Sequence, residues 1–263
     1  MKLQVKYLWV LLFATLLWAP ALKAGEIFVS NDEWMFTNDV LGLSSPNNND
    51  AQFAQNIAGW LTGGSGKILI DSSNFGLNGA DLNTELTNLG YTVTETPGAT
   101  NFSNYNAVFV GGNGGSVNNA ALISYVNGGG SVFVEAGTGD LGPVGEAAEW
   151  NTFLNAFGLS LAPVYNGIGT GSEPGSDINV SAFQFQGPYG AALFTGVDNV
   201  FIWNGNDVSG AGPGVQTWTT DGGDGLYGAW QGTAVTPEPV SMLLMGTFLS
   251  LAGGLLSKKK RAL

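Results

Sequence analysis

The side chains of this chain that could do chemistry are carboxylates and amides, because its 263 residues include no histidine and no cysteine. These absences exclude Cys–His and Ser–His nucleophiles, histidine-ligated zinc and the usual general base of near-neutral pH. They also exclude a disulfide framework. Any catalysis would depend on aspartate and glutamate, the acid and base of most glycosidases.

Several carboxylates, amides and one tryptophan come directly after segments that read as strands. In open α/β sheets, ligands bind beyond the carboxyl ends of the strands. Such a group could bind a sugar through hydrogen bonds and ring stacking, but Asp, Asn and Gly are also ordinary turn residues. Both interpretations stay open for the candidate crevice residues, which are Asp32, Glu33, Trp34, Asp71, Asn74, Asn113, Glu135 and Asp140.

The charge of the chain restricts its partners. From Gly25 to Ser257, Lys67 is the only basic residue against 20 acidic ones, which gives a net charge of −19. Such a surface repels phosphate backbones, so we expect no nucleic-acid partner. The acidic surface is either a solvated face or a binding surface for calcium outside the cell. The glycine-rich run Asp221–Gly225 departs from the spacing of a calcium loop, so we predict no cofactor, with calcium left open.

An alternation of apolar runs and helical stripes predicts the elements that carry these residues. Ala51 to Leu61 has the spacing of a helix, with Asp50 as its N-cap. Consecutive apolar residues indicate strands that are buried on both faces. The pattern predicts an α/β fold, a parallel sheet with helices on both faces, with strands at 26–30, 67–71, 91–95, 107–111 and 131–135.

After Leu161 the sequence becomes rich in Gly, Asn, Ser and aromatic residues, with no helical period. We expect residues 25–161 to form the core domain. Residues 162–233 would be a β-rich extension of the same domain, contributing edge strands and loops. The strand candidates in this extension are Val180–Phe185, Asn199–Trp203, Val215–Thr219 and Leu226–Trp230.

The stretch from Lys67 to Gly139, with "KILIDSSNFG", "LGYTV", "YNAVFVGG" and "LISYVNGGGSVFVEAGTG", resembles class I glutamine amidotransferase-like flavodoxin folds. Enzymes of that family place a nucleophilic cysteine at the turn after a strand such as Ser131–Glu135. This chain has Ala136, Gly137 and Thr138 there. The resemblance therefore implies a flavodoxin-like scaffold without amidotransferase chemistry.

The N-terminus has the pattern of a secretory signal peptide. Lys2 and Lys6 precede an apolar run from Tyr7 to Trp18, and small residues follow. A charged start, a short apolar core and an A-x-A-like end are typical of such peptides. We predict a signal peptide over residues 1–24, cleaved between Ala24 and Gly25, with signal peptidase and the secretion machinery as partners.

The C-terminal residues 234–263 combine three features. Val240 to Leu256 is a run of 17 residues without charge, about 26 Å long as a helix and close to the minimum for a membrane span. A basic cluster follows that would stay in the cytoplasm, and two prolines around a glutamate precede the run in an extended, accessible form. The predicted cytoplasmic stop is Lys258, Lys259, Lys260 and Arg261, and the extended segment is Pro237, Glu238 and Pro239.

This ordered combination resembles the PEP-CTERM protein-sorting signal. The resemblance implies recognition by an exosortase, with Pro237, Glu238 and Pro239 as the sorting motif. It also implies export across the inner membrane in a bacterium that makes exopolysaccharide. The protein would be anchored by its C-terminal transmembrane helix until processing and would then lie at the cell surface or outside the cell.

Two functions follow from the sequence. The first is an exported, non-catalytic protein of the cell surface or extracellular matrix, with a glycan-binding crevice and exopolysaccharide as a partner. The alternative is an extracellular polysaccharide hydrolase that uses Asp and Glu carboxylates alone.

Overall fold

The computed structural model describes residues 24–42, 49–112, 118–137, 141–169 and 175–233. The chain divides into two units, and all described residues belong to the unit Ala24–Thr233, called the body below. The predicted signal peptide up to Lys23 lies outside the described residues. The predicted sorting motif, the span Val240–Leu256 and the basic cluster lie outside them too. Within the described ranges, none of the helices combines the length and apolar character that crossing a membrane requires.

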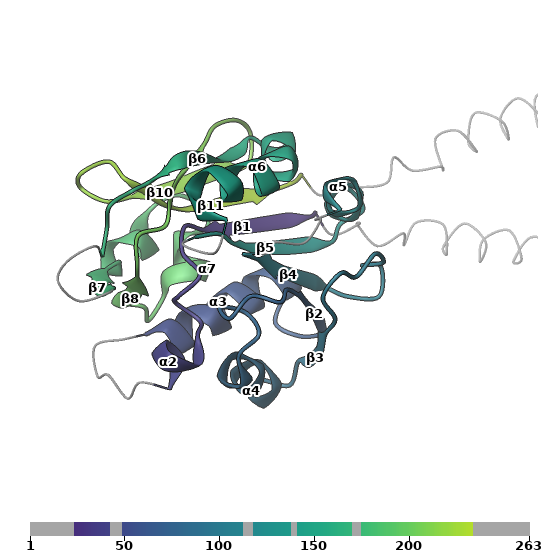
Figure 1. The fold of residues 1–263 in the computed structure, drawn as a ribbon. Coiled ribbons are helices and arrows are strands. Elements are labelled where there is room, and N and C mark those ends of the chain that lie inside the picture. The colour runs from purple at the N-terminus through teal and green to yellow at the C-terminus, as the bar shows by residue number, and fades with distance from the viewer. Residues whose placement is uncertain (1–23, 43–48, 113–117, 138–140, 170–174, 234–263) are drawn as a thin grey trace, which may run out of the picture. The chain divides into compact units, whose positions relative to one another are not determined.

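A seven-stranded sheet runs through the described part of the body in the order β10-β11-β1-β5-β4-β2-β3 (Figure 1). The five strands from β1 to β3 in this order pair in parallel, while β11 joins β1 and β10 joins β11 antiparallel. The predicted α/β fold with a mostly parallel sheet is confirmed. The parallel strands are β1 (Glu26–Ser30), β2 (Lys67–Asp71), β3 (Thr92–Glu95), β4 (Ala107–Gly111) and β5 (Ser131–Glu135), and the antiparallel ones are β10 (Val215–Thr219) and β11 (Gly225–Gln231).

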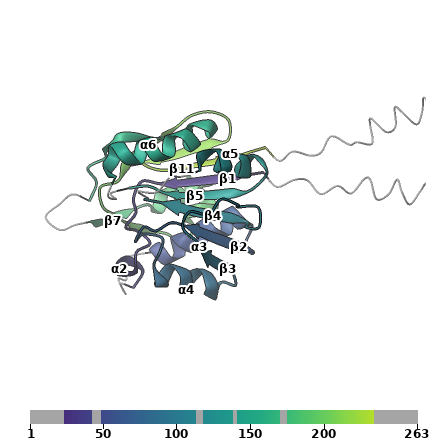
Figure 2. The same cartoon turned by 45° about the vertical axis from the view of Figure 1, so that its right-hand side comes forward.

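The alternation of side chains along the strands builds a core on each face of the sheet. Phe28, Phe109 and Phe133 point to one face and pack with α3 and α4, while Val29 and Val134 point to the other and pack with α5 and α6. Figure 2 shows these helix pairs on opposite sides of the sheet. The helices are α2 (Asn38–Leu41), α3 (Asp50–Thr62), α4 (Ala80–Asn88), α5 (Asn119–Asn127) and α6 (Gly142–Leu154).

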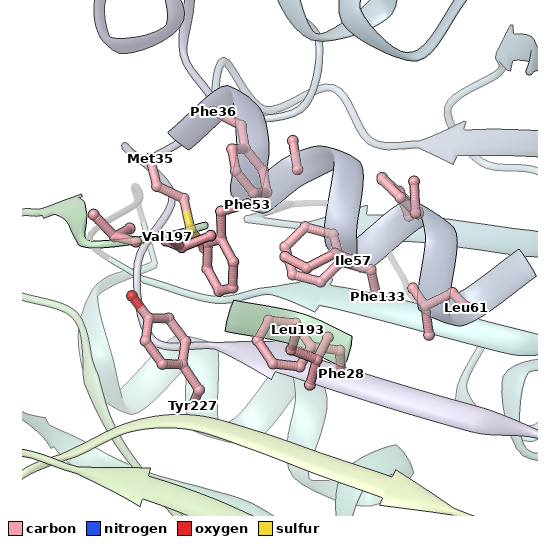
Figure 3. Packing of buried hydrophobic residues seen from close by; sticks show 14 of the residues in the cluster. Phe28, Met35, Phe36, Phe53, Ile57, Leu61, Phe133, Leu193, Val197 and Tyr227 are labelled. Carbon is pink, nitrogen blue, oxygen red and sulfur yellow. The ribbon is translucent and has the colours of Figure 1, made fainter. Parts of the chain in front are cut away.

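Helix α3 shows how the sequence sets this packing. Phe53 lies on its buried stripe, and its ring meets that of Phe28 edge-on with centroids 5.7 Å apart (Figure 3). Gly63, at φ 74°, ends the helix in the left-handed conformation that glycine adopts readily. The predicted N-cap was wrong, because Asp50 is the first helical residue and its carboxylate instead accepts the backbone N–H of Phe201 at 3.2 Å.

Beyond Leu161 the structure has strands at three of the four expected places, at 199–202, 215–219 and 225–231, and departs from the expectation at the fourth. The predicted strand Val180–Phe185 was wrong: Ser181 to Phe185 form a 3-10 helix, η2. The Asn179 Oδ1 starts this turn by accepting from the Ser181 hydroxyl at 2.7 Å. Two further small sheets pair β6 with β9 and β7 with β8. The elements are η1 (Asn155–Phe157), β6 (Leu159–Tyr165), β7 (Ser176–Asn179), η2 (Ser181–Phe185), α7 (Gly190–Phe194), β8 (Asn199–Ile202) and β9 (Asn206–Gly210).

Both ends of the body lie at the amino end of β1. The Gly232 N–H donates to the Gly25 carbonyl oxygen at 3.0 Å, which closes the antiparallel pairing of β1 with β11. The carboxyl ends of the five parallel strands lie at the other end of the strands, and this end of the sheet is called the rim below. The body therefore begins and ends at the amino end of β1, at the end of the sheet opposite the rim.

Candidate functional site

Asp32 lies in the loop that follows β1 at the rim, and only 1% of its surface is exposed. Its Oδ1 accepts the backbone N–H of Trp34 at 3.0 Å, and its Oδ2 accepts the backbone N–H of Trp203. Burial raises the pKa of Asp32 to about 6, against the lowering effect of these hydrogen bonds. One carboxylate thus joins two segments that are far apart in the sequence.

Glu33 and Asn74 meet between the ends of β1 and β2. Glu33 is fully buried, and the Asn74 side-chain amide donates to its Oε2 and to the Gly112 carbonyl oxygen, both at 3.0 Å. The Asn74 Oδ1 accepts the Gly76 N–H at 2.8 Å. Asn74 therefore connects the loops after three strands of the sheet.

Glu135 is the last residue of β5 and is fully buried beside this group. Among the described residues, neither of its carboxylate oxygens has a hydrogen-bond partner. Burial, followed by the negative charges of Glu33 and Asp32, raises its pKa well above the ordinary value. A Cβ at Gly76 would lie 2.5 Å from Glu135 Oε2 and closer still to the Glu33 carbonyl oxygen. Only a glycine fits between these two acids.

Sequence reasoning missed a fourth buried acid, Glu146 of α6. Its Oε2 accepts the Trp150 indole N–H at 2.9 Å, one helical turn away. Burial, and then the charge of Glu33, raises the pKa of Glu146 to about 8. The spacing of four residues between Glu146 and Trp150 on one helix face was the available signal.

Three aromatic rings gather beside the buried acids: Trp34, Phe75 and Trp203, called the rim aromatics below. The Trp34 ring centroid lies 4.5 Å from that of Trp203 and 4.9 Å from that of Phe75. Phe75 is 47% exposed, and both tryptophans are partly exposed. Of the three, only Trp34 was a predicted site residue. The contacts of the other two depend on loops that meet only in the folded chain.

Asp71 does not join this group. Its Oδ1 accepts the backbone N–H groups of Gly98 at 2.6 Å and Ala99 at 3.1 Å, so the side chain holds the loop after β3. Burial raises its pKa as well. For Asp71 the turn interpretation describes what the side chain does, while the predicted crevice residues Asn113 and Asp140 lie outside the described residues.

The arrangement offers rings at the surface and acids beneath it. In the described part of the chain, no cluster of three or more Asp or Glu side chains has an arrangement that could hold a metal ion. The absence of a cofactor stays a prediction, with calcium left open. The rim aromatics are exposed or partly exposed, whereas Glu33, Glu135 and Glu146 have no exposed surface. Binding by stacking is the chemistry for which the exposed side chains are suited.

Comparison with known proteins found no match to a family model, to a curated protein or to a solved structure.

Proposed function

We propose that the body is a non-catalytic glycan-binding domain of an exported cell-surface or extracellular-matrix protein, which an exosortase sorts through Pro237, Glu238 and Pro239. The observation that carries the glycan-binding part is the group of rim aromatics. Partly exposed tryptophan side chains at the rim suit the apolar faces of sugar rings.

The burial of the acids supports a non-catalytic body. A glycosidase needs two carboxyl groups that flank the bond to be broken, but Glu33, Glu135 and Glu146 have no exposed surface. The alternative of a polysaccharide hydrolase has one observation in its favour. A carboxyl group with a raised pKa, such as that of Glu146 at about 8, is typical of a general acid.

The strand order supports a flavodoxin-like scaffold with one change. Strands β3, β2, β4 and β5 stand in the places of the first four strands in the flavodoxin order 2-1-3-4-5. The fifth place belongs here to β1, which comes first in the chain. The helices after β1 and β5 cover opposite faces, so the loops after these two strands diverge. A divergence of this kind is where ligands bind in open sheets.

Glycan binding is tested with the purified full chain on an array of polysaccharides, beside Trp34→Ala and Trp203→Ala. Loss of a stacking tryptophan should weaken binding roughly 30-fold, the effect of about 2 kcal/mol. The matched control is Phe185→Ala, because Phe185 is an exposed aromatic on η2, outside the rim aromatics. Equal binding by all four proteins would refute the rim site. Release of new reducing ends that stops in Glu146→Gln would favour the hydrolase.

Sorting is tested by replacing Pro237, Glu238 and Pro239 with alanine in cells that contain an exosortase. We expect the variant to stay uncut in the membrane, as the wild type should in cells without the enzyme. Thr236→Ala, next to the motif, is the control and should be processed normally. A triple variant that is shortened and distributed like the wild type would disprove the sorting proposal.

A further inference from the structure

We infer that Asp32 is a positioning residue that brings Trp34 and Trp203 together into one stacking surface, and that this surface assembles only when Asp32 is ionised. The glycan that would use the surface rests on the proposed function, but the assembly of the surface does not. The inference depends on the two hydrogen bonds of Asp32 and on the contact between the two rings.

The Asp32 side chain bridges two loops through two hydrogen bonds, which are together called the clamp below. One carboxylate oxygen accepts the Trp34 N–H at 3.0 Å and the other accepts the Trp203 N–H. Trp34 follows β1 and Trp203 follows β8, yet their ring centroids are 4.5 Å apart. Because the clamped backbone atoms belong to the residues that carry the rings, any change at Asp32 moves the rings themselves.

Ionisation decides whether Asp32 can hold both amides. A carboxylate accepts hydrogen bonds on both oxygens, whereas a protonated carboxyl group has one O–H that donates instead. At a pH above the Asp32 pKa of about 6 the carboxylate accepts both N–H groups, and the clamp is complete. Below that pH the protonated oxygen is a poorer acceptor, so the hydrogen bond from one of the two N–H groups is weakened. The surface should therefore be assembled at neutral pH and loosened in mild acid.

The charged and titratable groups around Asp32 are acids and a tyrosine. Glu33 is its neighbour in the loop, and Asp32 interacts electrostatically with Glu135 of β5, Asp50 of α3 and Tyr227 of β11. Glu146 of α6 acts on Glu33 in turn. Lys67, the one basic residue of the body sequence, lies at the amino end of β2, at the end of the sheet opposite the rim. Among the described residues no cation lies near Asp32 to keep it ionised, so its ionisation responds to the pH of the surroundings.

The test is the exciton couplet that two neighbouring tryptophan rings give in circular dichroism, measured on the purified full chain. Trp34→Phe and Trp203→Phe identify the couplet, since each should abolish it. In the wild type we expect its amplitude to fall at least about twofold as pH drops through roughly 6, while the helical signal is retained. In Asp32→Asn it should be weak at every pH, because the asparagine amide would face the Trp203 N–H with a second donor.

Asp71→Asn is the matched control. Asp71 is also a rim carboxylate that accepts two backbone N–H groups, but it holds neither tryptophan, so this variant should keep the wild-type couplet and its pH profile. A wild-type couplet that does not change with pH, or an Asp32→Asn couplet like that of the wild type, would overturn the inference. If Asp32→Asn does not fold, the wild-type titration alone decides.

Binding of a neutral gluco-oligosaccharide, measured in parallel, separates the inference from the proposed function. If the couplet follows pH as expected and the sugar also binds more weakly in acid, both stand. If the couplet follows pH and neither this sugar nor any glycan on the array binds, the positioning role of Asp32 stands and the proposed function fails.

Discussion

The paired strands β1 and β5 have a buried glutamate at each end, and the two glutamates differ in their hydrogen bonding. At the amino end, Glu26 lies opposite Ser131, and its carboxylate accepts the Gln231 side-chain amide at 2.6 Å and the Ser131 hydroxyl at 3.5 Å. At the rim, Glu135 lies opposite Ser30 and neither of its oxygens has a hydrogen-bond partner among the described residues. The same residue type is satisfied at one end and left unsatisfied at the other.

Two tyrosines repeat the contrast. Near the amino end, the Tyr125 hydroxyl donates to the Tyr105 carbonyl oxygen at 3.0 Å. At the rim, Tyr227 pairs with Ser30 across the sheet, and its fully buried hydroxyl has no partner in the described part of the chain (Figure 3). Unsatisfied buried polar groups lower stability, and proteins tolerate such conflicts mostly at functional sites. The glutamate and tyrosine at the amino end therefore stabilise the fold through hydrogen bonds, whereas those at the rim lower its stability.

The pH dependence of stability is the largest effect expected from this difference. An acid whose pKa is raised on folding stabilises the protein below its unfolded pKa, and this stability is lost as pH rises through the folded pKa. For Glu146 the window runs from 4.5 to about 8, worth roughly 5 kcal/mol. We expect urea unfolding to show a stability maximum in mild acid and a loss of several kcal/mol by pH about 8.

Glu146→Gln should remove the part of that loss that comes from Glu146, since the amide does not titrate, while Glu135 and Asp32, whose pKa values are also raised, keep the remaining slope. A wild-type protein that is most stable near pH 8, or a variant with the full wild-type slope, would break the comparison of the two ends.

Gly76→Ala should cost about 3 kcal/mol, because the added Cβ would overlap the Glu33 carbonyl oxygen and Glu135 Oε2. Gly59→Ala, in the middle of α3 where a Cβ meets nothing within 4 Å, should instead stabilise by up to about 1 kcal/mol. Thermal unfolding of the two variants compares them directly. Equal effects would mean that the rim is less tightly packed than its glycines indicate.

Glu135→Gln should raise the free energy of unfolding by about 2 kcal/mol at pH about 8, because glutamine does not titrate, whereas burial without a hydrogen-bond partner makes ionisation of Glu135 unfavourable in the folded protein. Glu26→Gln should lower it by roughly 0.5–1 kcal/mol, because it weakens the charge-assisted bond from Gln231. Opposite signs in urea unfolding would sharpen the comparison. A destabilised Glu135→Gln variant would contradict it.

The smallest effect concerns the tyrosines. Tyr227→Phe should change the free energy of unfolding by less than about 0.5 kcal/mol, since no hydrogen bond among the described residues is lost. Tyr125→Phe should cost about 1 kcal/mol with the loss of its bond to Tyr105. If the phenylalanine variants rank the other way in thermal unfolding, the Tyr227 hydroxyl has a stabilising role at the rim.

Four of the five parallel strands could be predicted because they are short, consecutive apolar runs such as Ile68 to Ile70, buried on both faces. The fifth, β3, is mostly polar and was predicted from its alternation. The order of the strands follows from the chain only in part, since nothing local shows that β1 lies beside β5. After Leu161 the elements have no more than seven residues, too few for a period to emerge. Phe183 and Phe185 alternate like a strand, but the turn at Asn179 imposes a 3-10 helix.

The residues of the candidate site also divide into those that local sequence could indicate and those that only the folded chain brings together. Asp32, Glu33 and Asn74 could be found because they directly follow predicted strands. Trp203 could not, since a hydrogen bond across 171 positions brings it to Asp32. Glu146 was missed because its burial comes from how α6 packs on the sheet. Its spacing of four residues from Trp150 is the one local feature that points to this burial.

The pairing of β11 with β1 has a mechanical consequence. The chain leaves the body at Thr233, directly after β11, and the rim lies at the other end of the same strands. A pull between a ligand at the rim and Thr233 would load β11 along its length. Its hydrogen bonds to β1 and β10 lie across that direction, so they would have to shear together instead of opening one at a time. The sheet should resist a force along its strands more strongly than a force that separates the strands one hydrogen bond at a time.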